Sequence, residues 1–268
     1  MNPRVLALFS KELLELRRHP GIFLPAILTG ATAIALPLMV AIGVPLMTGE
    51  PLARSPEDVF VQELWTASPE LRPLGPEGTM QSWMFRQFLL LLVMSPIAAA
   101  MSVAAWAIIG EKQARSLEPL LASPVTTFEL LAAKTMSALL PAVALSIAMF
   151  GVYLTAIALL AGSDVARSLL SAQPLSVMFL LGPLAALAAL QLAVCMSSRA
   201  SDPRSAQQMG ALIILPLAGL MVLQLMGAVP LTLVNVLLIA AGLVAVNAAL
   251  AAAAVAVFDR ESILTRWK

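Results

Sequence analysis

The sequence has few charged residues, one cysteine and one histidine. Charged residues make up 12% of the 268 positions, whereas a soluble domain has roughly 25%. Cys195 has no second cysteine with which to form a disulfide or a cysteine metal site. His19 is the only histidine, which removes most histidine-dependent catalysis. An intramembrane enzyme or a metal centre is therefore poorly supported.

Two further signals are missing from the sequence. The net charge is +1, so no overall basic bias indicates a nucleic-acid partner. The Gly-x-x-x-x-Gly-Lys-Ser/Thr motif of P-loop ATPases is also absent, and the Gly-Glu-Lys run at 110–112 lacks its spacing. The chain is therefore not expected to be an enzyme or to hold a cofactor, and any ATP hydrolysis would take place on another polypeptide.

Apolar residues dominate what is present. They make up 60% of the chain, and the mean hydropathy is +0.93. A transmembrane helix needs about 20 mostly apolar residues. Six segments meet that requirement: 22–47, 84–109, 135–161, 175–197, 209–229 and 231–257. We predict a single all-α, polytopic membrane domain over residues 1–268, in which a very tight turn at 227–230 joins the last two helices. A partly re-entrant hairpin is the alternative for 209–257, if protein buries its backbone.

The distribution of Lys and Arg predicts the orientation. Six spans place both termini on one side, and that side collects 12 of the 16 basic residues. The opposite side has Arg54, Arg72, Arg86 and Arg167. Because loops rich in Lys and Arg stay in the cytoplasm, both termini are predicted to be cytoplasmic. The charged, amphipathic segment 1–19 is unlike a signal peptide.

Two segments outside the spans have helical patterns. Segment 1–20 has an apolar stripe beside Arg4, Lys11 and Arg18, which predicts a helix lying in the membrane interface. Segment 48–83 is predicted to be an extracytoplasmic loop. Within it, Ser55-Pro56-Glu57-Asp58 predicts a short helix with Ser55 as N-cap, Pro56 in its first position and acids in its first turn.

The cytoplasmic segment 110–134 is the most informative stretch of the sequence. It predicts a short amphipathic helix with charges on one side and leucines on the other, which could insert into a groove on a cytoplasmic partner. The residues predicted to couple this chain to that partner are Glu111, Arg115, Leu117, Glu118, Leu120 and Leu121.

At these residues the chain resembles the type 2 ABC transporter permeases, and most of all the sodium- and drug-export branch. The resemblance rests on Glu111, Leu117, Glu118, Leu120, Leu121, Pro124 and Lys134, on Lys11-Glu12-Leu13, and on the tail 258–264. It implies a permease dimer, as a homodimer or with a sister subunit, served by two ABC ATP-binding subunits that carry ATP and Mg. With the absence of a targeting peptide, it also implies the cytoplasmic membrane of a bacterium.

Four polar residues within the predicted spans form a candidate translocation path: Gln191, Gln224, Asn235 and Asn247. Hydrogen bonds between helices are the favoured explanation of such residues. No charged residue lies well inside a predicted span, so a carrier driven by buried carboxylates is poorly supported. An amphiphilic or lipid-like substrate suits this apolar interior better.

Three functions remain after these exclusions. The leading hypothesis is the permease subunit of an ATP-driven exporter, embedded in membrane lipids. The second is a membrane scaffold of the same architecture that assembles a surface machine without transporting anything. The third is a secondary carrier, which would work without an ATPase partner.

Overall fold

All elements of the described chain are helices. The computed structural model describes residues 9–10, 14, 16, 18–53, 55–113, 127–197 and 214–257, and every element within them is helical. Among these residues, five helical stretches are long and apolar enough to cross a membrane: Gly21–Thr48, Pro69–Val103, Ala132–Leu160, Ala172–Ala193 and Leu233–Ala254. The prediction of an all-α, polytopic membrane protein is therefore confirmed.

The fifth predicted span, 209–229, is represented by a shorter apolar helix. This helix, α13, covers Ile214–Leu225 and has 12 residues, fewer than the roughly 20 that a crossing needs. The predicted residues before position 214 lie outside the described part of the chain. The count of six spans therefore stays a prediction.

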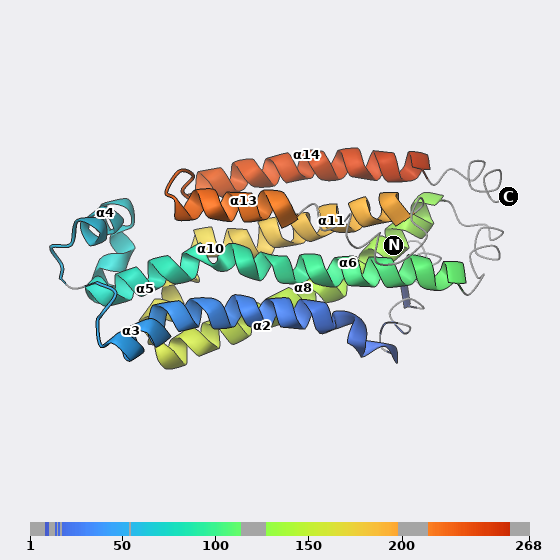
Figure 1. Cartoon of the computed structure of the whole chain (residues 1–268). Helices are drawn as coiled ribbons and strands as arrows, with labels where there is room; N and C mark the ends of the chain where they lie inside the picture. Colours follow the sequence, from blue (N-terminus) through green and yellow to red (C-terminus); the bar gives the residue numbers. More distant parts are fainter. Residues whose placement is uncertain are drawn as a thin grey trace.

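The helices lie side by side, and successive passes run in alternating directions (Figure 1). In chain order they are η1 Pro20–Phe23, α2 Leu24–Leu38, η2 Met39–Gly43, α3 Val44–Thr48, α4 Val59–Ala67, η3 Pro69–Leu74, α5 Gly75–Gln87, α6 Leu89–Gln113, α8 Thr127–Leu160, α9 Ser163–Ser168, α10 Ala172–Ser176, η4 Val177–Leu181, α11 Gly182–Ser197, α13 and α14 Leu233–Val257. We call the end with α4 and the α13–α14 turn the α4 end. The last residues of α6, α11 and α14 lie at the opposite end.

Helix α6 lies at the centre of the bundle. It contacts α2, α8 and α11, and its side chains Leu89, Leu90, Val93 and Ile97 are fully buried. Among lipids, such contacts are held by close packing and hydrogen bonds rather than by the hydrophobic effect. The Ser95 hydroxyl supplies one of these bonds, because it donates to the Ala26 carbonyl of α2 at 3.1 Å.

Gly30 allows α2 to approach α6 and α8 closely. A Cβ atom at this position would lie 3.2 Å from the Ser95 Oγ and 3.2 Å from the Met149 Cγ. Small residues at such crossings let helix backbones pack tightly in membranes. The absence of a side chain at Gly30 therefore helps to hold three helices together.

Two spans contain a π-helical turn next to a proline. The turn η2 follows Pro37 in the first span, and η4 precedes Pro183 at the start of α11. Proline has no N–H and clashes with the carbonyl four residues earlier, and a π turn is one way for a helix to accommodate such a disturbance. The π turns mark two places where the α-helical spacing changes.

The segment between the first two spans is more ordered than predicted. Helix α4 begins at Val59, and its N-cap is Asp58, whose carboxylate accepts the Phe60 N–H at 3.1 Å. Ser55 is therefore not the cap that the sequence suggested. Helix α5 also begins at Gly75, well before the predicted span start at 84. The prediction missed this because Gly75-Pro76 resembles a turn, although Pro76 is well tolerated in a first helical turn.

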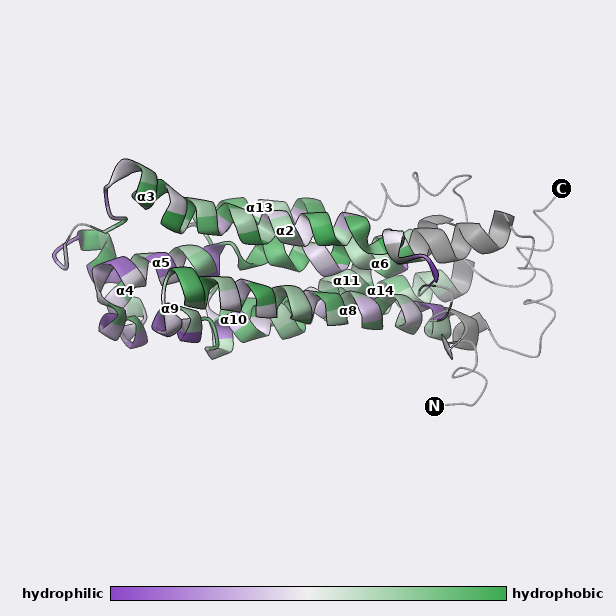
Figure 2. Ribbon diagram, turned by 90° about the horizontal axis from the view of Figure 1, so that it is seen from below, coloured by the Kyte–Doolittle hydropathy of each residue, from purple (hydrophilic) through white to green (hydrophobic). Residues whose placement is uncertain are grey.

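Helix α4 packs on α5 through aromatic side chains. The Trp65 indole N–H donates to the Thr79 hydroxyl at 2.9 Å, and the Phe60 ring meets Trp83 edge-on with centroids 5.0 Å apart. Val61 is fully buried. The segment predicted as a loop therefore covers the α4 end with packed structure, and hydrophilic residues gather there (Figure 2).

The predicted interfacial helix falls mainly outside the described residues. Arg4 and Lys11 are among the residues that are not described. Leu14, Leu16 and Arg18 are helical; Leu16 is buried, whereas Leu14 and Arg18 are exposed. The interfacial role of this segment stays a prediction.

Candidate functional site

Most of the predicted coupling segment 110–134 lies outside the described residues. Its residues Arg115, Leu117, Glu118, Leu120 and Leu121 lie outside the described residues. Glu111 falls in the last turns of α6. The end of α6 and the start of α8 lie at the end of the bundle opposite α4 (Figure 1), so the segment that joins them begins and ends there.

The four polar residues of the candidate translocation path do not gather at one site. The Asn247 amide donates to the Leu184 carbonyl of α11 at 3.0 Å and to the Leu243 carbonyl of its own helix at 2.8 Å. Gln191 lies on α11, and its side-chain oxygen is buried with no hydrogen-bond partner among the described residues. Asn247 thus makes the bond between helices that was the alternative to a path.

Asn235 stabilises the turn between α13 and α14. Its amide donates to the Pro230 carbonyl at 2.7 Å, and its backbone N–H donates to the Thr232 hydroxyl at 3.3 Å. Gly227 adopts a left-handed conformation with φ of 72°, which glycine tolerates without steric cost. The very tight turn predicted at 227–230 is therefore present.

Gln224 lines a polar cavity at the α4 end. The cavity has a volume of ≈ 490 Å³, and its walls come from η3, α5, α10 and the α13–α14 turn. Its polar lining residues are Ser68, Glu70, Arg86, Gln87, Ser171, Gln173, Gln224 and Thr232. Trp83, Leu231 and Leu233 supply apolar wall. The volume lies within the range of about 300–1,000 Å³ typical of small-molecule sites.

Arg86 is the cation of this cavity. Its side chain is 12% exposed, and its guanidinium donates to the Ser168 carbonyl at 2.8 Å and the Ser171 hydroxyl at 3.4 Å. The nearest carboxylate is that of Glu70, 3.8 Å away on a side chain that is 57% exposed. The sequence placed Arg86 with the external basic residues. In the structure its side chain extends from α5 to the end of α9 and is largely buried in the wall of the cavity.

Gln87 and Gln224 join α5 to α13. The Gln224 amide nitrogen donates to the Gln87 side-chain oxygen, and both side chains are buried. The Gln224 oxygen has no hydrogen-bond partner among the described residues. Gln224 was a candidate from its sequence position, whereas Gln87 and Arg86 were not. The Arg86-Gln87 pair at the start of an apolar run is the sequence signal that could have indicated them.

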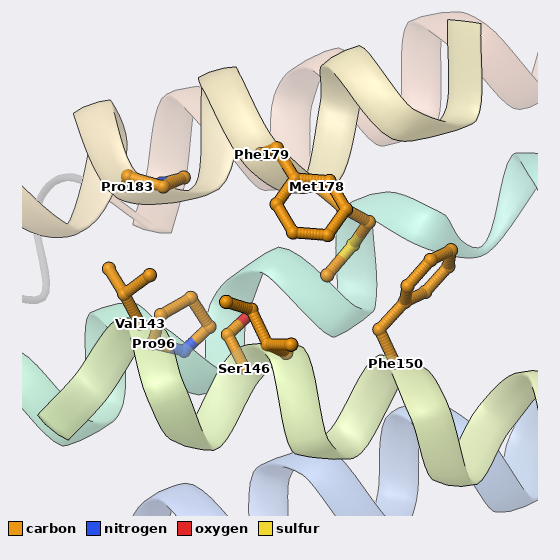
Figure 3. A pocket seen from close by; sticks show the side chains of 8 residues that line it. Pro96, Val143, Ser146, Phe150, Met178, Phe179 and Pro183 are labelled. Carbon is orange, nitrogen blue, oxygen red and sulfur yellow. The ribbon is translucent and has the colours of Figure 1, made fainter. Parts of the chain in front are cut away.

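A second depression, between α6, α8 and the start of α11, is apolar (Figure 3). Its lining residues include Pro96, Phe150, Phe179 and Pro183, and it has no room for a water molecule. The Phe150 and Phe179 rings pack edge-on, with centroids 6.3 Å apart. This depression is a packing crevice rather than a binding site.

The fold defines a multi-pass membrane protein, and comparison with known families is more specific. The family model of the ABC-2 family transporter proteins matches residues 68–252. This match covers more than half of the chain, which therefore belongs to the ABC-2 type transporter permease family. It is a membrane permease subunit of an ABC transporter, and membership implies association with an ABC ATP-binding subunit. No curated protein and no solved structure matches the chain.

Proposed function

We propose that this permease subunit works in export. It pairs with a second permease chain, identical or sister, and two ATP-binding subunits bind the dimer from the cytoplasm. ATP and Mg are held by those subunits, and both termini of this chain face the cytoplasm of a bacterium. Substrate moves outward by alternating access or lateral release at the dimer interface.

The observation that carries this proposal is the family match over residues 68–252, which spans the predicted coupling segment. The export direction rests on the resemblance of that segment to export permeases. The positions of α6 and α8 support the coupling role, because both helices meet segment 114–126 at the end of the bundle opposite α4. That end is also the one to which the Lys and Arg tally assigns the cytoplasm.

Co-purification tests whether segment 110–134 binds an ATPase. We expect the tagged full chain, isolated from its native host in mild detergent, to retain a P-loop ATPase. Glu118→Arg and Leu121→Asp should release it, because the first reverses a charge and the second places a charge among the leucine anchors.

Matched controls come from the exposed surface of α4. Glu63→Arg and Val59→Asp make the same kinds of change at the opposite end of the bundle, where Val59 is 74% exposed. Both controls should retain the ATPase. Loss of the ATPase from all four variants would contradict the coupling role. Failure of the wild-type chain to retain an ATPase would favour a carrier or a scaffold. ATP-dependent release of substrate from vesicles separates an exporter from a scaffold.

A further inference from the structure

We propose that the polar cavity at the α4 end binds a zwitterionic phosphate group. Its phosphate lies against Arg86, and its N–H donor bonds to the Gln224 side-chain oxygen. This inference goes beyond the proposed function, because binding at this cavity requires neither the ATPase nor the direction of transport.

The first argument is the incomplete neutralisation of Arg86. A buried guanidinium is costly unless anions and acceptors satisfy it. The two hydrogen bonds of Arg86 go to neutral oxygens, on Ser168 and Ser171. Its Nε atom is buried and, within the described residues, has no acceptor. A phosphate oxygen is the acceptor that a guanidinium binds most strongly.

The second argument is the unsatisfied amide oxygen of Gln224. This side chain is 4% exposed, and its nitrogen is already bonded to Gln87. Leaving a buried acceptor unpaired is unfavourable, because the oxygen has lost its water partners without gaining a donor. The wall of the cavity therefore holds one unpaired acceptor, on Gln224, and one cation, Arg86, whose ion pair with Glu70 spans 3.8 Å.

Glu70 makes a purely anionic ligand a poor match. Its carboxylate lines the cavity and lies 3.8 Å from Arg86, longer than the about 2.7–2.9 Å of a charge-assisted hydrogen bond. It therefore keeps capacity for a second cation. A ligand that carries an ammonium next to its phosphate places the ammonium near Glu70 and Gln224 and the phosphate near Arg86.

The position of the cavity favours the headgroup of an amphiphile. The cavity is lined by residues of η3, α5, α10 and the α13–α14 turn, and hydrophilic residues gather at this α4 end of an otherwise largely apolar bundle (Figure 2). Leu231 and Leu233 form part of its wall, and Leu233 is 40% exposed. Such a boundary holds a polar headgroup in the cavity while an attached apolar chain extends along the bundle.

Calorimetric titration of the purified full chain in maltoside detergent tests the proposal. The probe is dihexanoyl phosphatidylethanolamine, kept below its micelle concentration, and we expect saturable binding. Arg86→Gln should weaken binding about tenfold or more, the value of one charge-assisted hydrogen bond. The matched control is Arg72→Gln, which makes the same charge change at an exposed residue of the same end, outside the cavity lining, and should bind as the wild type does.

A second comparison tests the donor. Dihexanoyl phosphatidylcholine keeps the phosphate but has no N–H, so it should bind more weakly to the wild type. Gln224→Leu should remove that preference. This variant also keeps the proposal testable if Arg86→Gln does not fold, because Arg86 contributes to packing. The soluble headgroup glycerophosphoethanolamine identifies the source: equal binding indicates a free solute, and binding of the dihexanoyl lipid alone indicates a membrane amphiphile.

Three results would overturn the proposal. The first is that none of these probes binds saturably. The second is that Arg86→Gln and Arg72→Gln bind the probe with equal affinity. The third is that Gln224→Leu still prefers the ethanolamine lipid to the choline lipid. None of them bears on the permease function, which the co-purification experiment tests separately.

Discussion

Helices α6 and α14 have the same length, 25 residues each, and similar apolar sequences, yet they are buried to very different extents. In the most apolar part of the Pro69–Val103 span, which includes much of α6, 67% of the residues are buried. In the corresponding part of the Leu233–Ala254 span, 17% are buried. Exposed side chains such as Leu237, Leu238 and Val244 cover the outer face of α14.

The difference shows that hydropathy does not measure burial in this protein. Lipid tails are as apolar as leucine, so a span carries the same composition whether protein or lipid surrounds it. Helix α6 differs from α14 because neighbouring helices surround it on more sides. The number of neighbouring helices depends on the tertiary arrangement. Within the described part of the chain, no element covers the outer face of α14, which leaves it for lipid or for a second chain.

The largest expected effect comes from truncating a buried leucine. Leu90 on α6 is fully buried, whereas Leu238 on α14 is 66% exposed. Large-to-small changes in packed cores cost about 2–5 kcal/mol, so Leu90→Ala should clearly lower the thermal midpoint of the detergent-purified protein. Leu238→Ala should leave it nearly unchanged. Equal shifts would show that α14 is covered as tightly as α6.

A smaller effect is expected from filling a close helix crossing. Gly30→Leu forces a side chain against Ser95 and Met149, and overpacking of this kind costs about 1–3 kcal/mol. Size-exclusion profiles after heating should show less folded protein than the wild type. The control is Gly242→Leu on α14, where an added Cβ meets no atom within 4 Å. If the control changes the elution volume without loss of fold, that face of α14 contacts a second chain.

The smallest effect tests the polar bond between α14 and α11. Asn247→Leu removes the hydrogen bond to the Leu184 carbonyl, and such bonds in membranes average about 0.6 kcal/mol, with a maximum near 1.7. The thermal midpoint should fall slightly, and Ala248→Leu, a change at the exposed neighbouring position, should not lower it. A higher thermal midpoint for Asn247→Leu than for the wild type would mean that Asn247 serves another role, such as one in the candidate translocation path.

The sequence predicted the fold class, the last tight turn and the family of this protein. Apolar runs of sufficient length predicted an all-α membrane protein, because the backbone in lipid must satisfy its own hydrogen bonds. Glycine and proline at 227–230 predicted the tight turn between α13 and α14. The resemblance at segment 110–134 predicted the family, and the match over residues 68–252 confirms it.

The polar cavity was not predicted, for a physical reason. Its walls come from four parts of the chain, and no local pattern brings Glu70 or Gln173 to Arg86. Arg86 is the third residue of the predicted span 84–109 and was assigned to the outside by its charge alone. Only the packing of α5 against α9 and the α13–α14 turn shows that this charge is buried. The same limit applied to Asp58, which caps α4 in place of Ser55.

The π turns η2 and η4 have a consequence for how the chain tolerates changes in length. A π turn holds one residue more than the α-helical turn it replaces. Deleting one residue within Val177–Leu181 therefore lets this turn return to α-helical spacing. The side chains of α11 then continue to face the same neighbouring helices. Deleting one residue within α14 rotates everything after it by about 100°. Insertions and deletions inherited among related chains should accordingly concentrate at η2 and η4.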